Sequence, residues 1–273
     1  MHHSRPLSTS PPPRRGVTLI ELLVALAIMA ILIGILLPTL STMRRRGIVL
    51  DDSNRIRMLQ LAHVAYMSEH DAQMIDAGLP HGAPQDETVA WINTLKPYLD
   101  GSTEILKSPL DTSPHWPASD GGPGVPLDGS TDRFRRTSYG INNFLTQYAP
   151  LEPVRRMDAI RSPARTVHFL PMAEQGAFAG ADHVHAENWW INDAFPDAPP
   201  ALADDMVAIN AVSGDDIETP EQSTAGWESR ANYGFVDGHV ETLSFVEVFR
   251  SPTRNRFDPD VSWTNADRLN REG

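Results

Sequence analysis

Residues 17–40 decide how this chain is built. They read VTLIELLVALAIMAILIGILLPTL and contain one charged residue, Glu21. As a helix rising about 1.5 Å per residue, this segment would extend about 36 Å, enough to cross a hydrocarbon core about 30 Å thick. A cleaved secretory signal is the alternative, but such signals have apolar runs of about 7–15 residues and a small-residue cleavage site, which Pro38-Thr39-Leu40-Ser41 does not resemble. We therefore expect a membrane-embedded helix over 17–40.

The charges divide the rest of the chain into a basic start and an acidic body. Residues 1–16 carry three arginines and no acid, residues 41–50 carry Arg44, Arg45 and Arg46, and residues 51–273 carry 34 acids against 17 bases. The two flanks of the apolar segment carry equal numbers of arginines, so the positive-inside rule does not predict its orientation in the membrane. The acidic body argues against nucleic-acid binding, which needs a basic stripe. The absence of cysteine excludes disulfides, cysteine zinc sites and a thiol nucleophile.

Glu21 is costly in this position, because a carboxylate in lipid is penalised by roughly 2–3 kcal/mol. Either its side chain reaches the lipid headgroups, or it awaits a cationic partner in an assembly. Pro38 removes one backbone hydrogen bond and would kink the helix near the membrane exit, unless it simply ends the helix there.

The surrounding residues resemble the N-terminal signature of type IV prepilins and type II secretion pseudopilins. Arg14-Arg15-Gly16 is followed by Val17-Thr18-Leu19-Ile20-Glu21-Leu22 and later by Pro38. The resemblance implies a leader over 1–16 that a prepilin peptidase removes after Gly16, followed by N-methylation of Val17. The usual first mature residue of that family is Phe, so Val17 is a departure. A new α-amine at Val17 would pair with Glu21 of a neighbouring subunit, removing two unpaired charges from a packed helical core.

Beyond the membrane segment, the pattern predicts an α+β protein with an antiparallel sheet. Residues 41–70 continue the helix as an amphipathic stretch whose apolar face, with Ile56, Leu59, Ala62 and Tyr66, should lie on the acidic domain at 71–273. Residues 88–99 suggest one short helix ended by Pro97, and 111–130 and 192–226 are expected to be irregular loops.

Two strand signals stand out in the acidic domain. Residues 166–170 are rich in β-branched and apolar side chains and are predicted to form a strand. Asp237-Gly238 between two β-rich runs predicts a two-residue hairpin turn that pairs Phe235 with Val240 and Val236 with His239. The phase of Leu243 and Phe245 predicts a bulge in the second strand.

Short elements of the domain resemble those of a large group of bacterial prepilin-type proteins that end in a His-x9-Asp-Gly motif. They appear in order along the chain: Ser108-Pro109-Leu110-Asp111, Thr137-Ser138-Tyr139-Gly140-Ile141-Asn142, Ile160-Arg161-Ser162-Pro163-Ala164-Arg165-Thr166 and Phe235-Val236-Asp237-Gly238-His239-Val240. Ser108 replaces a Cys of that group, and Trp227 stands ten residues before Asp237 where the group has His. The role of that His is therefore in question here.

The most ligand-like cluster is His183, His185 and Glu187, which would share one face of a strand and could be joined in space by Asp237 and His239. Two His and a carboxylate suit Zn²⁺, although solvated side chains are the plain alternative. The resemblance to pseudopilins also implies a structural Ca²⁺ in the domain, and the acidic body offers oxygens at Asp204, Asp205, Asp215 and Asp216. The sequence lacks a Ca²⁺-loop motif, so no Ca²⁺ ligands are assigned. It also lacks a GxSxG elbow, a P-loop and a GxGxxG motif. We expect no enzyme and no required cofactor.

The resemblance implies a structural filament subunit, anchored once in the cytoplasmic membrane with its C-terminal domain on the periplasmic side. Its partners would be a prepilin peptidase, further copies of itself, other pilin-like subunits and an inner-membrane assembly platform. The alternative is a single-pass anchored extracytoplasmic binding protein, with or without a bound metal, and a third hypothesis is an anchored hydrolase.

Overall fold

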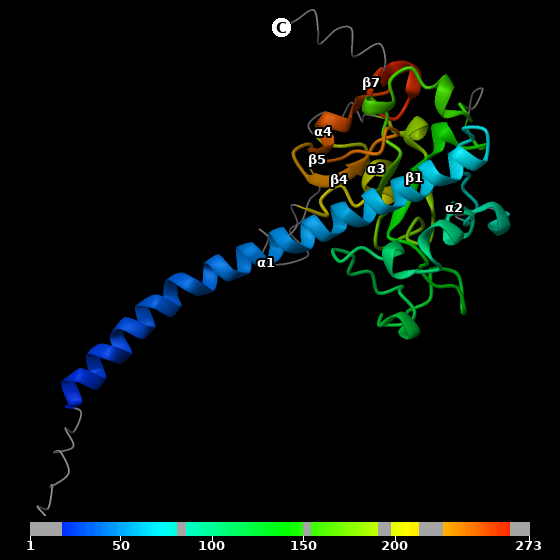
Figure 1. Cartoon of the computed structure of the whole chain (residues 1–273). Helices are drawn as coiled ribbons and strands as arrows, with labels where there is room; N and C mark the ends of the chain where they lie inside the picture. The colour runs from blue at the N-terminus through cyan, green and yellow to red at the C-terminus, as the bar shows by residue number, and fades with distance from the viewer. Residues whose placement is uncertain (1–17, 81–85, 150–153, 191–197, 213–225, 263–273) are drawn as a thin grey trace, which may run out of the picture. The chain divides into compact units, whose positions relative to one another are not determined.

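The computed structural model describes residues 18–80, 86–149, 154–190, 198–212 and 226–262 (Figure 1). The chain divides into two compact units, Met1–Arg46 and Gly47–Gly273. The leader, including Gly16, and the expected first mature residue, Val17, lie outside the described residues. The predicted α+β class is confirmed, because a long apolar helix precedes a domain that contains antiparallel sheets.

Helix α1 spans Leu19–Glu69. Its backbone stays helical through Pro38, so the alternative that Pro38 ends the helix is wrong. Pro38 has no N–H to offer to the preceding turn. The neighbouring Thr39 hydroxyl donates a 3.0 Å hydrogen bond to the carbonyl oxygen of Ile35.

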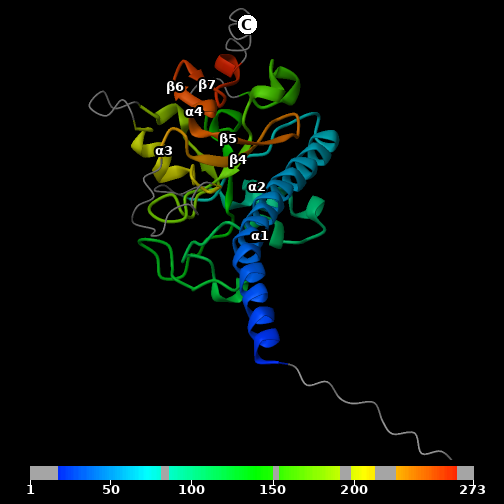
Figure 2. The ribbon, with the colours of Figure 1, turned by 90° about the vertical axis from the view of Figure 1, so that its left-hand side faces the viewer.

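In the part of α1 that belongs to the second unit, the predicted apolar face packs on the domain. Ile56, Leu59 and Ala62 are buried and Tyr66 is half-buried, in a cluster with side chains from α2 and the first sheet. Gly234 lets β4 approach the helix closely, since a Cβ there would lie 2.6 Å from Ile56 Cγ2. Figures 1 and 2 show this part of α1 lying along one side of the domain.

The segment after α1 differs from its prediction. Instead of one helix over 88–99, three short turns follow one another: 3₁₀ turns at Glu87–Val89 and Lys96–Leu99 flank α2, Trp91–Thr94. Pro97 falls within the last turn, so the chain cannot continue an α-helical ladder through it. Trp91, Leu95 and Leu99 are nevertheless all buried.

The central sheet has the order β2-β1-β3, with β1 at Tyr139–Asn142, β2 at Phe169–Pro171 and β3 at His183–Val184. β1 and β2 are antiparallel, but β1 and β3 are parallel, so the sheet is mixed rather than purely antiparallel. The strand predicted at 166–170 begins three residues later, and Val167 forms an isolated bridge with Phe235 instead.

The hairpin is confirmed, but the predicted register is wrong. β4, Arg230–Gly234, pairs with β5, Val240–Ser244, so that Gly234 lies opposite Val240. Phe235 therefore faces His239, and its N–H donates to the His239 carbonyl oxygen at 2.9 Å. The loop has three residues, and Gly238 takes the left-handed conformation (φ 95°) that such a loop requires. The ladder itself is regular, so the predicted bulge is absent from this pair.

The remaining described α-helices and strands border a second apolar core, which contains Trp189, Phe245 and Phe257. They are α3 at Ala201–Met206, α4 at Phe245–Val248, and the hairpin of β6, Phe249–Ser251, with β7, Arg254–Asn255. Phe245 begins α4 rather than continuing β5. α3 lies within the predicted irregular insertion at 192–226, of which 198–212 are described, so that prediction is wrong there. The 111–130 segment holds one 3₁₀ turn, Ala118–Asp120, and no longer element.

Candidate functional site

Glu21 is held at the start of α1 by Thr18. The Glu21 Oε2 atom accepts hydrogen bonds from the Thr18 N–H at 2.8 Å and from the Thr18 hydroxyl at 2.9 Å. In return, the Glu21 N–H donates to Thr18 Oγ1 at 3.3 Å. This reciprocal pattern is a capping box, which satisfies backbone donors that a helix start otherwise leaves unpaired. Sequence reasoning missed this role of Thr18, although the spacing Thr-x-x-Glu ahead of an apolar run is its signal.

The apolar side chains that follow Glu21 are uncovered. α1 is the single helix among the described residues that is long and apolar enough to cross a membrane, and its most apolar window, of mean hydropathy 2.9, has no buried residue. Leu19 and Ile35, for example, are 81% and 66% exposed. Such a continuous apolar surface is unstable in water and requires lipid or other protein segments around it.

In the second unit, a buried carboxylate ties α1 to the domain. Asp52 is 2% exposed and accepts hydrogen bonds from the Tyr139 hydroxyl at 2.7 Å, from Asn232 Nδ2 at 2.7 Å and from the Ser108 hydroxyl. Burial, followed by the charge of Asp52, raises the pKa of Tyr139 well above its usual value, so the phenol remains a donor. Three neutral donors from three distant segments thus stabilise one carboxylate on α1.

The same segments meet in a second polar cluster. Asp111 Oδ2 accepts hydrogen bonds from Arg135 Nε at 2.7 Å and from the Ser138 hydroxyl at 2.6 Å, and Ser138 Oγ accepts from the Ser108 N–H at 2.7 Å. The Arg135 side chain is fully buried and also donates to the carbonyl oxygens of Met172, Ala173 and Ala179. The elements at 108–111 and 137–142 therefore form one polar network that supports the fold.

Two further residues singled out in the sequence are also structural. The Asn142 side chain donates to the carbonyl oxygens of Val167 at 2.9 Å and Phe257 at 2.6 Å. Trp227 packs on the second core and stacks on Phe245, with the Arg250 guanidinium 4.8 Å from its ring centroid. An apolar ring occupies this position, so Trp227 contributes packing and a cation–π contact rather than a titratable group.

His183, His185 and Glu187 are neighbours but do not share a strand face. β3 ends at Val184, and Ala186–Asn188 forms a 3₁₀ turn, so the predicted alternation breaks after two residues. The two imidazole rings meet edge to face with centroids 4.8 Å apart. His185 Nδ1 lies 2.8 Å from Glu187 Oε1, and that oxygen also accepts from Asn143 Nδ2 at 2.6 Å.

The carboxylates around this cluster are engaged in the fold. Asp182 accepts from the N–H groups of Gly78 at 3.0 Å and Leu79 at 3.1 Å, and its Oδ1 lies 3.0 Å from His183 Nδ1. Asp237 and His239 pair with each other, and His239 stacks on Phe235. In the part of the chain that the structure describes, no three His, Asp or Glu side chains are arranged to hold a metal ion. Of the acids considered for Ca²⁺, Asp215 and Asp216 lie outside the described residues.

A second histidine pair lies between α1 and the central sheet. His63 and His168 are buried with ring centroids 4.4 Å apart, and His168 Nδ1 lies 3.0 Å from Gln60 Oε1. Burial lowers the pKa of His63 to about 3. Burial and the neighbouring His63 hold the pKa of His168 well below its usual value. Both imidazoles are therefore neutral packing groups at neutral pH.

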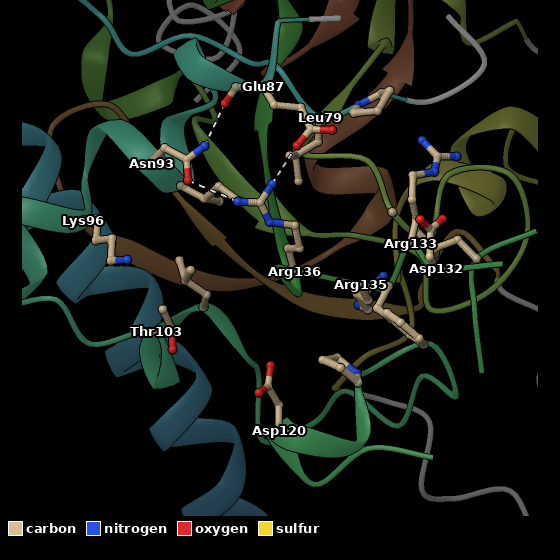
Figure 3. Close-up of a pocket in the computed structure, with 17 residues that line it drawn as sticks. Leu79, Glu87, Asn93, Lys96, Thr103, Asp120, Asp132, Arg133, Arg135 and Arg136 are labelled. Carbon is tan, nitrogen blue, oxygen red and sulfur yellow. Dashed lines mark hydrogen bonds and ion pairs between the residues drawn. The ribbon is translucent and has the colours of Figure 1, made fainter. Parts of the chain in front are cut away.

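A pocket of about 460 Å³ opens beside α2 and the 132–136 segment (Figure 3). Its polar lining is partly engaged, since Arg136 donates to Glu87 Oε2 at 3.0 Å and to Asn93 Oδ1 at 3.1 Å. Lys96 and Asp120 also line it. The lining therefore mixes both signs of charge.

Similarity to known protein families lies in the N-terminal segment. Residues 12–37 match the family model described as the prokaryotic N-terminal methylation motif. No curated protein and no solved structure matches the chain.

The matched residues contain Gly16, Val17, Glu21 and most of the uncovered apolar part of α1. The motif implies processing by a prepilin peptidase and assembly with pilin-like subunits, and one N-terminal apolar helix fits a single-pass membrane anchor. The chain thus carries the prepilin-type cleavage and methylation signature, and with it the mark of a type IV pilin-like or pseudopilin-like precursor.

Proposed function

We propose that the chain is the precursor of a structural subunit in a type IV pilus-like or type II secretion pseudopilus filament. A prepilin peptidase cleaves the Gly16–Val17 bond and methylates the new amine of Val17. The observation that carries the proposal is the methylation motif at 12–37, which runs directly into an apolar helix with no covering side chains.

The geometry of Glu21 supports its proposed part in assembly. The capping box holds its carboxylate against the N–H and the hydroxyl of Thr18, the residue after the terminus that cleavage would create. A protonated α-amine from a neighbouring subunit can pair with this carboxylate when helices bundle, which removes two charges that an apolar core would penalise. We assign processing to Gly16, Val17 and Glu21, and assembly to Val17, Glu21 and Pro38.

In this role the acidic domain lies on the periplasmic side of the cytoplasmic membrane until an inner-membrane assembly platform adds the subunit to a filament. The subunit performs no catalysis and needs no cofactor. The likeness of the segments at 108–111, 137–142, 160–166 and 235–240 to the His-x9-Asp-Gly group remains a prediction, since the matched family model ends at residue 37.

The test is intact mass and N-terminal sequencing of the full chain from membranes that contain an active prepilin peptidase. Loss of residues 1–16 with N-methylated Val17 is expected. Membranes with an inactive peptidase are the matched control and should yield the uncut chain. An uncut chain in both membranes would mean that the N-terminal helix is a plain signal anchor and that the proposed function is wrong. Metal analysis of the purified domain would then decide whether His183, His185 and Glu187 support an anchored binding protein instead.

A further inference from the structure

The pocket beside α2 combines an apolar floor with a charged rim (Figure 3). Leu79, Ile92 and Leu106 line it and are buried, whereas Lys96 and Arg136 line it and are exposed. All of its lining residues belong to the second unit, Gly47–Gly273. Its volume of about 460 Å³ lies within the range of small-molecule sites, which pair an apolar surface with a few polar groups.

The acidic side chains of the rim already have hydrogen-bond donors. Glu87 Oε2 accepts from Arg136 at 3.0 Å. Asp120 and Asp132 each accept a hydrogen bond from a neighbouring serine hydroxyl, at 3.1 Å and 3.3 Å. A cationic ligand would therefore have to compete with donors that the protein itself supplies.

Lys96 differs from these acids, because its ammonium group makes no hydrogen bond or ion pair with any described residue. Figure 3 shows its side chain reaching into the pocket. On the same rim, the Thr103 hydroxyl makes no capping hydrogen bond to the turn that follows it. A lysine ammonium can only donate hydrogen bonds. The open polar positions of the pocket are thus donors, and they suit a ligand that accepts hydrogen bonds and carries negative charge.

Arg136 adds a guanidinium of fixed orientation. Glu87 Oε2 and Asn93 Oδ1 hold two of its nitrogens, at 3.0 Å and 3.1 Å. A guanidinium has further N–H groups in the same plane, which remain for a ligand. Because Glu87 already balances the charge of Arg136, Lys96 adds a positive charge that no hydrogen-bonded acid balances.

We propose that this pocket binds a small organic acid, a molecule with an apolar body and a carboxylate group. The apolar body lies on the floor formed by Leu79, Ile92 and Leu106, and the carboxylate accepts hydrogen bonds from Lys96 and Arg136. Hydrogen bonds between charged groups are about twice as strong as those between neutral groups, so the carboxylate selects the ligand. Binding here needs neither cleavage nor filament assembly and therefore goes beyond the proposed function.

The test measures binding to the full chain in phosphatidylcholine nanodiscs by surface plasmon resonance, with empty nanodiscs as the reference. The probes are phenylacetate, phenylbutyrate and naphthoate, each beside its own neutral amide, which keeps the apolar body. At least one carboxylate should bind about tenfold more tightly than its amide, a difference of about 1.4 kcal/mol.

Two variants connect this preference to the pocket. Lys96→Gln should lower the carboxylate affinity about tenfold and leave the amide affinity unchanged, because it removes the charge and keeps a polar side chain. Thr103→Trp places a large ring on the exposed rim and should abolish binding of both probes. Arg254→Gln is the matched control, since Arg254 is an exposed cation of β7 outside the pocket lining, and it should change neither affinity.

Three outcomes would overturn the inference. No binding of any carboxylate at millimolar concentration would mean that the pocket is not a site for organic acids. Equal affinities of every carboxylate and its amide would mean that the pocket does not select anions. Carboxylate binding that persists unchanged in both Lys96→Gln and Thr103→Trp would place the site elsewhere on the chain.

Discussion

Asn232 Nδ2 lies 2.7 Å from Asp52 Oδ2, a hydrogen bond that joins β4 to α1 across 180 residues of sequence. Asp52 receives two more hydrogen bonds, from Ser108 and Tyr139, and has almost no contact with solvent. Asp52 is therefore a buried polar anchor of α1 on its domain, beside the apolar contacts of Ile56 and Leu59.

Replacing Asp52 should destabilise the domain markedly. Asp52→Ala leaves three buried donors without their acceptor, and the loss should be about 3 kcal/mol or more in the free energy of unfolding. Denaturant unfolding of the full chain in detergent, followed by tryptophan fluorescence, measures it. Asp51→Ala removes the neighbouring, half-exposed carboxylate and should cost well under 1 kcal/mol. Equal effects of the two substitutions would refute the role of Asp52.

Acid should weaken the domain through the buried histidines. Folding lowers the pKa of His63 to about 3 and lowers that of His168, from an unfolded value near 6.5. The folded state binds fewer protons, so this stability is complete above pH 6.5 and is lost as pH falls from 6.5 toward 3. Each histidine should lower the free energy of unfolding by up to about 1.4 kcal/mol for each unit by which the pH falls.

His63→Leu should flatten that slope, because it leaves one titrating group instead of two. Melting temperatures from pH 7.5 to 4.5 test this, with His70→Leu as a control at an exposed histidine of the same region. An unchanged pH slope in His63→Leu would show that other groups govern the acid response.

Glu21 should separate membrane insertion from assembly. Glu21→Leu removes the one charge of the apolar segment, so insertion should persist or improve. Filament assembly should fall at least tenfold, since an unpaired buried amine costs several kcal/mol and each 1.4 kcal/mol is a factor of ten. Immunoblots of membrane and sheared filament fractions give both values. Thr18→Val removes the hydroxyl of the capping box while Glu21 remains, so it shows how much of the effect is capping. Normal assembly of Glu21→Leu would remove the proposed pairing.

The hairpin loop should depend on Gly238. Its φ of 95° is unfavourable for residues with a Cβ, so Gly238→Ala should cost about 1–2 kcal/mol. Gly226→Ala is the matched control, because Gly226 has open space around it and no left-handed backbone. Thermal unfolding of the two variants should differ accordingly. A neutral Gly238→Ala would mean that the loop can adopt another turn.

Local sequence patterns predicted the parts of the fold that depend on neighbours in sequence. The spacing of Ile56, Leu59 and Ala62 revealed the buried face of α1, and Asp237-Gly238 revealed the hairpin. The register failed by one residue because a two-residue and a three-residue loop share the same Asp-Gly signal. The motif around Gly16 and Glu21 was readable because its spacing is short and specific.

Contacts between distant segments could not be read from the sequence. Nothing near Asp52 distinguishes it from the exposed Asp51, because its three donors come from positions 108, 139 and 232. His183 and His185 looked like alternating strand residues, yet β3 ends between them at Val184. Their burial and partners depend on how three separate segments meet.

The three hydrogen bonds to Asp52 also have a mechanical consequence. A subunit that is pulled by its membrane helix must transmit that force to its globular domain. Tension along α1 would reach Asp52 before the covalent connection at the far end of the helix, and three hydrogen bonds from three segments would share it. The helix would then carry the domain as one body instead of peeling away from it.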